Sequence, residues 1–438
     1  MREQTKAQTQ IQIKTQAQRQ VTLDKNQTKS AELLRHKIEG MDAMKKGKNN
    51  LITDVAGVRV GHYTINDGKL QTGVTVVLPV VDNIYLNKCV SNVEIINGFG
   101  KSAGLVQLNE LGQLESPIAL TSTLNVGKVC DALVSTTIEA CQADAYDVMT
   151  FNPIVAECND SYLNAIQTRL IGYDEVKSAM ASATEIFDQG AVGAGRGMSC
   201  HGLKGGIGSA SRMISIDEKE YTLGVLVQAN HGKLEDLVVA GEPMGKSLTL
   251  QVESLLEKYQ RTLKKDPAKI EALNNETLKG TLCKTLDIPQ NIPQNMSQEK
   301  DVIANGNDKA LENAIEKGEM GSIIVVMATD LPISALQIKR ILKRATVGIS
   351  RVGGYIHHGS GEIAIGFTTA NRVPHQDKGP YLDCKIITDQ WIDQAFRAMA
   401  EATEEAILKT LCHAETVVGR AGHCRVSLVD ALAEQLIL

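Results

Sequence analysis

Runs of β-branched and other apolar residues alternate with helix-like segments from about Leu51 to the end of the chain. Apolar runs that stop at glycine, proline or asparagine are typical of buried strands. They predict strands over 58–63, 72–79, 89–97, 221–230, 322–328 and 361–368. Apolar residues spaced three and four apart predict helices over 126–143, 161–167, 242–259, 334–349 and 389–409, with a short helix after Ser427. Strands and helices therefore mix throughout one globular body.

Two polar segments interrupt this pattern. The first 30 residues are rich in Gln, Lys and Thr and offer little to bury, whereas residues 31–46 fit an amphipathic helix. We expect residues 1–50 to be a flexible or helical extension and 51–438 to be a single domain. The second polar segment interrupts that domain as a linker insertion over 260–320. Insertions of this length are usually functional or disordered.

Composition narrows the class of protein. The 438 residues are 43% hydrophobic but only 3% aromatic, and they include 37 glycines, so tight turns and close backbone packing replace aromatic bulk. A net charge of -5 gives no electrostatic reason to bind nucleic acid or an acidic membrane. There is also no apolar run long enough to span a bilayer. We expect no nucleic-acid or membrane partner.

Cysteine and histidine spacing bears on metals and on the compartment. The nine cysteines are scattered without a CxxC pair, which argues against a disulfide framework and a zinc site. No HExxH motif occurs, and the pair His357–His358 lacks a partner motif. We therefore expect no metal, no other cofactor and a reducing, cytoplasmic location.

The candidate nucleophile is Ser322. It follows Gly321 at the end of the linker and stands directly before the β-branched run 323–329. If the chain cleaves itself between these two residues, Ser322 gains an α-amine that can accept the proton of its own hydroxyl. Taken alone, the same window also fits a loop residue before a buried strand.

Two further groups suit catalysis of acyl transfer. Ser360 and Glu362 are two residues apart at the start of a strand, so their side chains point to the same face. Asn230 ends another strand, where its amide could stabilise an oxyanion. The simpler interpretations are a glycine turn with a solvated glutamate, and an asparagine that stabilises its own turn.

The glycine-rich segment 190–212 contains Gly193-Ala194-Gly195. Its glycines continue towards another strand and not into a helix, so it does not fit a dinucleotide fingerprint. We expect it to form a wall of a pocket.

Together these blocks resemble the DmpA/BapA family of self-processing aminopeptidases, from about Ile52 to about Leu436. The similar blocks, in order, are 52–62, 72–79, 117–121, 190–212, 228–232, 321–332 and 359–368. The resemblance implies an α+β fold, a four-layer αββα sandwich like that of the ornithine acetyltransferases. Its architecture is similar to that of N-terminal nucleophile hydrolases, with different connections. It also implies autocleavage into an α chain, 1–321, and a β chain, 322–438.

The same resemblance implies roles for single residues. Ser322 matches the nucleophile, Ser360 and Glu362 the supporting hydroxyl and carboxylate, and Asn230 the oxyanion-stabilising amide. Tyr162 matches a tyrosine of the substrate pocket. The expected activity is a serine aminopeptidase or amidase that acts on small peptides, amides or esters through an acyl-enzyme. The family also implies a homo-oligomer, commonly four α/β pairs.

Two alternatives remain open at this point. The same fold could carry an amidase of a non-peptide metabolite such as a pantetheine-like amide, or a catalytically silent binding protein. The presence of Ser322, Ser360, Glu362 and Asn230 together favours an enzyme. The preferences for α- or β-aminoacyl groups, and for L or D residues, stay open.

Overall fold

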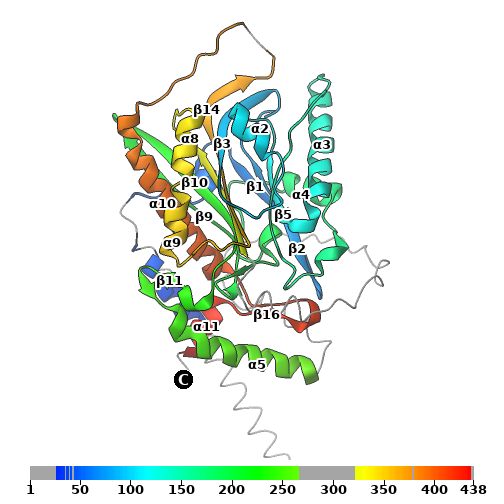
Figure 1. Ribbon diagram of the computed structural model, residues 1–438, viewed down its shortest axis with the longest axis vertical. Coiled ribbons are helices and arrows are strands. Elements are labelled where there is room, and N and C mark those ends of the chain that lie inside the picture. The colour runs from blue at the N-terminus through cyan, green and yellow to red at the C-terminus, as the bar shows by residue number, and fades with distance from the viewer. Residues whose placement is uncertain are drawn as a thin grey trace, which may run out of the picture.

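The computed structural model describes residues 26–34, 36–38, 40–41, 44–265, 321–376 and 379–435. Two sheets lie face to face, and helices cover the outer face of each, which gives four layers (Figure 1). This is the predicted αββα sandwich. Residues 1–25 and 266–320, which hold the predicted tail and most of the predicted linker, lie outside the described residues.

The smaller sheet has four strands in the order β1-β2-β5-β6. Only its β5–β6 pair is parallel. Residues Val74, Val76 and Ala119 of this sheet pack against helices α3 and α4 on its outer face. The bounds are β1 Arg59–Asp67, β2 Leu70–Leu78, β5 Ile118–Ser122, β6 Ile154–Cys158, α3 Val126–Ala143 and α4 Tyr173–Ala181.

The larger sheet has six strands in the order β4-β3-β14-β13-β10-β9. Its β13–β14 pair is parallel and its other pairs are antiparallel. Helices α8, α9 and α10 cover its outer face. The bounds are β3 Asn87–Gly98, β4 Gln113–Leu114, β9 Gly206–Ile216, β10 Lys219–Asn230, β13 Gly321–Thr329, β14 Ser360–Pro374, α8 Ala335–Leu342, α9 Ala345–Arg351 and α10 Asp393–His413.

Strand β13 is buried on both faces, which explains its unbroken apolar sequence. Ile324 and Val326 point into the core between the two sheets. Ile323, Val325 and Met327 point into the core beneath the helices. The register of this strand is therefore fixed by burial on both sides.

Shorter elements complete the fold. The remaining helices are α2 Leu105–Leu111, α5 Thr249–Lys265 and α11 Leu428–Gln435. The remaining strands are β7 Ser199–Cys200, β8 Leu203–Lys204, β11 Val238–Val239, β12 Glu242–Pro243, β15 Val417–Val418 and β16 Cys424–Arg425. The 3-10 turns are η1 Ile52–Asp54, η2 Thr123–Asn125, η3 Ile166–Thr168, η4 Gly193–Gly195, η5 Leu234–Asp236, η6 Gly245–Leu248, η7 Asp389–Trp391 and η8 Arg420–Gly422. No helix among the described residues is long and apolar enough to cross a membrane.

Three helix predictions need correction. The helix expected over 161–167 is wrong: the segment is a set of turns ending in η3. The Asn159 side chain accepts a hydrogen bond from the Ser161 N–H, and such local bonds compete with helix formation. The helix expected from residue 242 begins at Thr249, because Glu242–Pro243 pairs as strand β12. The helix expected over 334–349 is divided into α8 and α9.

The predicted extension also contributes to the core. Residues 26–34 are helical, and the side chains of Leu34 and Ile38 are buried beneath the larger sheet. The domain boundary drawn at residue 51 therefore omits chain that packs on the body.

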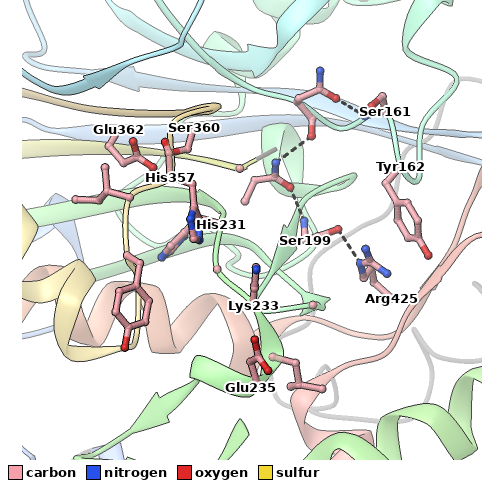
Figure 2. Close-up of a pocket in the computed structure, with 18 of the residues that line it drawn as sticks. Ser161, Tyr162, Ser199, His231, Lys233, Glu235, His357, Ser360, Glu362 and Arg425 are labelled. Carbon is pink, nitrogen blue, oxygen red and sulfur yellow. Dashed lines mark hydrogen bonds between the residues drawn. The ribbon is translucent and has the colours of Figure 1, made fainter. Parts of the chain in front are cut away.

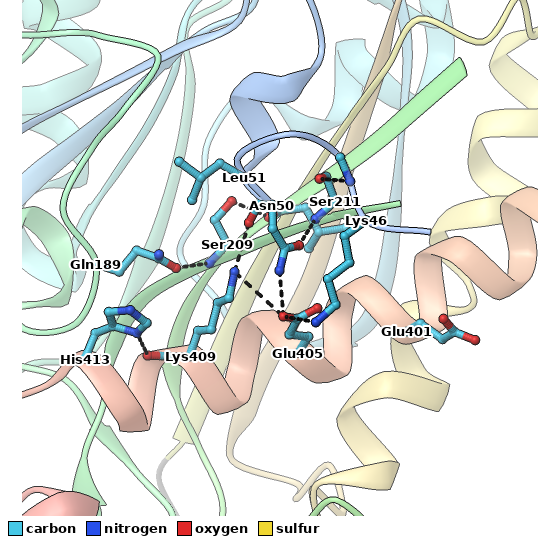
Figure 3. A network of polar contacts seen from close by, with 12 residues as sticks. Lys46, Asn50, Leu51, Gln189, Ser209, Ser211, Glu401, Glu405, Lys409 and His413 are labelled. Carbon is cyan, nitrogen blue, oxygen red and sulfur yellow. Dashed lines mark hydrogen bonds and ion pairs between the residues drawn. The ribbon is translucent and has the colours of Figure 1, made fainter. Parts of the chain in front are cut away.

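A buried ion network ties residues 46–50 to α10 and β9 (Figure 3). The Glu405 carboxylate pairs with Arg212 at 2.8 Å and with Lys46 at 3.1 Å, and it accepts a 2.7 Å bond from Asn50. Burial alone would raise the pKa of Glu405, but the cations of Lys409, Arg212 and Lys46 hold it below its usual value. The network is therefore charged, paired and sensitive to the loss of one member.

Replacing Arg212 by methionine will leave Glu405 buried without its closest guanidinium partner. Breaking such a pair costs about 3–5 kcal/mol, so we expect Arg212→Met to lower the free energy of unfolding in urea by that amount. Arg261 pairs with Glu257 on an exposed helix face, so Arg261→Met serves as the matched control and is expected to change stability by less than about 1 kcal/mol. Equal, small effects of both variants would contradict this account of the network.

Candidate active site

A cavity of about 400 Å³ opens at one end of the larger sheet (Figure 2). Strand β10 ends there, and β13 and β14 begin there. The cavity is lined by Asn230, Gly321, Ser360, Glu362 and Tyr162. Ser322 is the next residue of β13 and is 7% exposed. Five of the predicted site residues thus line the cavity, and Ser322 adjoins it through Gly321.

Sheet register decides how these side chains lie. Ser322 pairs with Asn230 on β10 and with Gly361 on β14. Directly paired residues point to the same face of a sheet, and neighbours along a strand to opposite faces. The side chains of Ser322 and Asn230 therefore share one face, whereas Ser360 and Glu362 share the other. Gly321 lies at the end of the sheet next to both pairs of residues, and it has no side chain that would extend into the cavity.

The Ser322 hydroxyl donates a 2.7 Å hydrogen bond to the carbonyl oxygen of Gly321. That carbonyl belongs to the peptide bond that joins Gly321 to Ser322. The arrangement holds a hydroxyl against the carbonyl group that a self-cleaving chain must attack. Ser322 is part of strand β13, so the alternative of a simple loop residue is excluded.

The Asn230 side chain is held by two segments that are remote in sequence. Its Oδ1 accepts a 2.7 Å bond from the Ser199 N–H, and its Nδ2 donates a 3.0 Å bond to the Asn159 carbonyl. A carboxamide nitrogen carries two protons, so one N–H remains for another acceptor. Since these contacts reach across to other elements, Asn230 does more than stabilise its own turn.

Glu362 is buried, with 2% of its surface exposed. Burial raises the pKa of its carboxyl, and the nearby Ser360 hydroxyl and Asn97 amide partly offset this. Its Oε2 has no hydrogen-bond partner among the described residues. The alternative of a solvated glutamate is thus wrong, and an unsatisfied buried oxygen is a ready acceptor for a cationic ligand.

Ser360 and Asn97 support this carboxylate from the neighbouring strand ends. The Ser360 hydroxyl donates a 2.6 Å bond to the His357 carbonyl, and the Asn97 amide donates a 2.9 Å bond to the same oxygen. Asn97 pairs directly with Glu362 across β3 and β14. The sequence analysis missed Asn97, although it stands near a strand end as Asn230 does.

Tyr162 forms the opposite wall (Figure 2). Its ring stacks on His423 at 4.6 Å, and the Arg425 guanidinium lies 3.6 Å from the ring centroid. Arg425 also donates to the Ser199 hydroxyl at 3.1 Å. Nothing in the sequence pointed to His423 or Arg425, because they come from the far C-terminal segment. The glycine-rich segment contributes Ser199 and Gly202 to the lining.

Comparisons with known proteins show the family of this chain. A profile of peptidase family S58 matches residues 50–425. The beta-peptidyl aminopeptidase BapA of Sphingosinicella microcystinivorans is 34% identical over 391 residues, which cover 87% of this chain and 86% of the relative.

Two solved structures are also similar. The PH0078 protein of Pyrococcus horikoshii OT3 is 38% identical, with a TM-score of 0.71 over 90% of this chain and 95% of that one. The L-aminopeptidase D-Ala-esterase/amidase of Ochrobactrum anthropi is 28% identical, with a TM-score of 0.70 over 90% of this chain and 96% of that one. The latter is described as a prototype for the serine aminopeptidases, with a variant of the Ntn hydrolase fold.

Proposed function

We propose that Ser322 is both the cleavage point and the nucleophile of this chain. The premise is that the chain belongs to peptidase family S58 and is a self-processing serine aminopeptidase. The observation that carries the proposal is the 2.7 Å contact between the Ser322 hydroxyl and the Gly321 carbonyl oxygen at the cavity. The amidase of a non-peptide metabolite and the silent binding protein are not favoured.

Cleavage begins when the Ser322 Oγ attacks the carbonyl carbon of Gly321. The bond between that carbon and the Ser322 nitrogen breaks, the nitrogen takes up the hydroxyl proton, and Gly321 is left as an ester on Oγ. Water hydrolyses the ester, which restores the hydroxyl and gives Gly321 a carboxylate. The products are the chains 1–321 and 322–438.

Catalysis repeats these steps with an external acyl group. The free α-amine of Ser322 accepts the Oγ proton, and Oγ attacks the substrate carbonyl. The remaining Nδ2 proton of Asn230 stabilises the oxyanion, a contribution of about 3–4 kcal/mol in comparable sites. The leaving amine departs with a proton, and water hydrolyses the acyl-enzyme. Sheet register favours the α-amine as base, because Glu362 points to the other face.

Glu362 selects substrates that have a free N-terminal amine. During cleavage, Gly321 forms an ester with the Ser322 Oγ. During catalysis, the N-terminal residue of the substrate forms an ester with the same Oγ, so this residue occupies the position of Gly321. Gly321 pairs directly with Ser360, two residues from Glu362. The unpartnered Oε2 of Glu362 then receives the substrate ammonium in a charge-assisted bond.

The substrates are small peptides, amides or esters. A cavity of about 400 Å³ suits a substrate of one or two residues more than a folded chain. The Sphingosinicella microcystinivorans relative is named as a beta-peptidyl aminopeptidase, which supports N-terminal β-amino acids as the first substrates to test. A β-amino acid has one more backbone carbon than an α-amino acid, and the absence of a side chain at Gly321 leaves space for that carbon.

Ser322→Ala removes the attacking oxygen, so we expect the purified protein to stay a single chain and to lack aminopeptidase activity. Ser322→Cys keeps a nucleophile at the same position and is expected to be cleaved. Denaturing electrophoresis and hydrolysis of an aminoacyl p-nitroanilide measure the two properties. A cleaved or active Ser322→Ala protein would remove Ser322 from both roles.

Glu362→Gln removes the charge that binds the substrate ammonium. Hydrogen bonds to charged groups contribute about 1.5–3 kcal/mol, so kcat/KM for substrates with a free amine should fall about 10- to 150-fold. Because burial raises the pKa of Glu362, the wild-type kcat/KM should fall with decreasing pH above the usual glutamate range. This acidic limb should vanish in the variant.

Glu235→Gln is the matched control, because Glu235 is an exposed carboxylate that also lines the cavity. It should keep the wild-type pH profile and nearly the wild-type kcat/KM. If Glu362→Gln retains the acidic limb, or if both variants lose activity equally, Glu362 does not bind the ammonium.

A further inference from the structure

Beside the cavity, the buried residues Cys200, His201 and His231 each offer one metal-ligating atom, and these atoms all lie within 4.8 Å of one another. We propose that the three side chains bind a divalent transition-metal ion, zinc by preference. The proposal goes beyond the aminopeptidase reaction, whose chemistry is carried by other residues. It also departs from the expectation of no metal drawn from the sequence.

A tight hairpin brings Cys200 and His201 together. Strands β7 and β8 pair through Cys200 and Leu203, and a two-residue loop of His201 and Gly202 connects them. Both loop residues have positive φ, 49° and 70°, as a type I′ turn requires. Asparagine and glycine are the usual residues there, and histidine also tolerates this conformation.

One backbone hydrogen bond links this hairpin to the end of β10. The His201 N–H donates to the His231 carbonyl at 2.7 Å. The Cys200 Sγ then lies 4.0 Å from the His231 Nδ1. Tetrahedral zinc with ordinary Zn–S and Zn–N bonds separates such atoms by about 3.6 Å, so a shift of a few tenths of an ångström completes the contact.

The His201 ring is already oriented for a ligand. Its Nδ1 lies 3.0 Å from the Lys233 carbonyl, which can only accept a hydrogen bond, so Nδ1 carries the proton and Nε2 carries a lone pair. A backbone carbonyl on the second ring nitrogen is the usual support of a metal-binding histidine. The His201 Nε2 is buried without a partner among the described residues, as is the His231 Nε2.

Packing alone accounts poorly for this cluster. The three residues are buried, and each unsatisfied buried polar atom costs about 1–3 kcal/mol. A bound ion would give the unpartnered His201 Nε2 a partner.

The donor set indicates which ion fits. One thiolate and two imidazoles suit zinc better than magnesium or calcium, which prefer oxygen. His231 lines the cavity together with Ser199 and Gly202. Ser199 donates to the Asn230 amide. The ion would therefore brace the hairpin, which holds the Asn230 side chain through Ser199, against the end of β10, which carries Asn230.

The test uses the full-length protein after dialysis against a chelator, with Co²⁺ as the probe and Zn²⁺ as the competitor. We expect one Co²⁺ per chain, a thiolate-to-cobalt charge-transfer absorption band, displacement by Zn²⁺ and a higher melting temperature with Zn²⁺. Cys200→Ala should abolish the band. Each of Cys200→Ala and His201→Asn should weaken binding by more than about 100-fold, the upper cost of losing a mere supporting contact.

Asparagine at position 201 tolerates the turn conformation, so His201→Asn should keep the hairpin. The control is Cys89→Ala, which removes a buried thiol from the core between the sheets. The control should bind Co²⁺ like the wild type. Absence of the band in the wild type, or binding unchanged by Cys200→Ala, would overturn the proposal. Because cobalt absorption and melting temperature are the readouts, neither result depends on chain cleavage or on aminopeptidase activity.

Discussion

The pairing of β13 with its two neighbours is the constraint on which the rest of this structure depends. Ser322 lies opposite Asn230 on one side and Gly361 on the other. A slip of β13 by one residue would turn the Ser322 side chain away from Asn230 and towards the face of Glu362. Because both faces of β13 are buried, such a slip would also move Ile324 and its neighbours from one hydrophobic core to the other. The packing of β13 therefore determines the geometry of the site.

Unsatisfied polar atoms gather at this same end of the sheet. Glu362 Oε2, His231 Nε2 and His201 Nε2 are all buried without partners among the described residues. Buried carboxylate oxygens without a hydrogen-bond partner also occur on Asp160 and Glu405, but these two residues do not line the cavity, whereas Glu362 does. The open oxygen of Glu362 is therefore accessible to a ligand in the cavity, and His231 also lines that cavity.

The sequence predicts those features of the site whose residues are close together in the chain, and misses those whose residues are far apart. The two-residue spacing of Ser360 and Glu362 was enough to predict a shared face, and the apolar run after Ser322 was enough to predict a buried strand. The strand-end position of Asn230 suggested its role, whereas the role of Tyr162 came from family resemblance alone. The contacts of these residues with Ser199 and Arg425 could not be predicted, because they join remote segments. Asn97 and the Cys200 cluster were missed for the same reason. The helix expected over 161–167 failed because local side-chain bonds outweighed apolar spacing.

The central claim is that one residue, Ser322, is first the cleavage point and then the acylated nucleophile. The most direct measurement is peptide mapping by mass spectrometry of active enzyme, mixed with an aminoacyl ester and quenched in acid. Trypsin cuts after lysine, so the account predicts a peptide covering 322–339, with a new N-terminus at Ser322 and the acyl group attached to it. An uncut peptide covering 318–339 in fully active enzyme, or an acyl group on another residue, would contradict it.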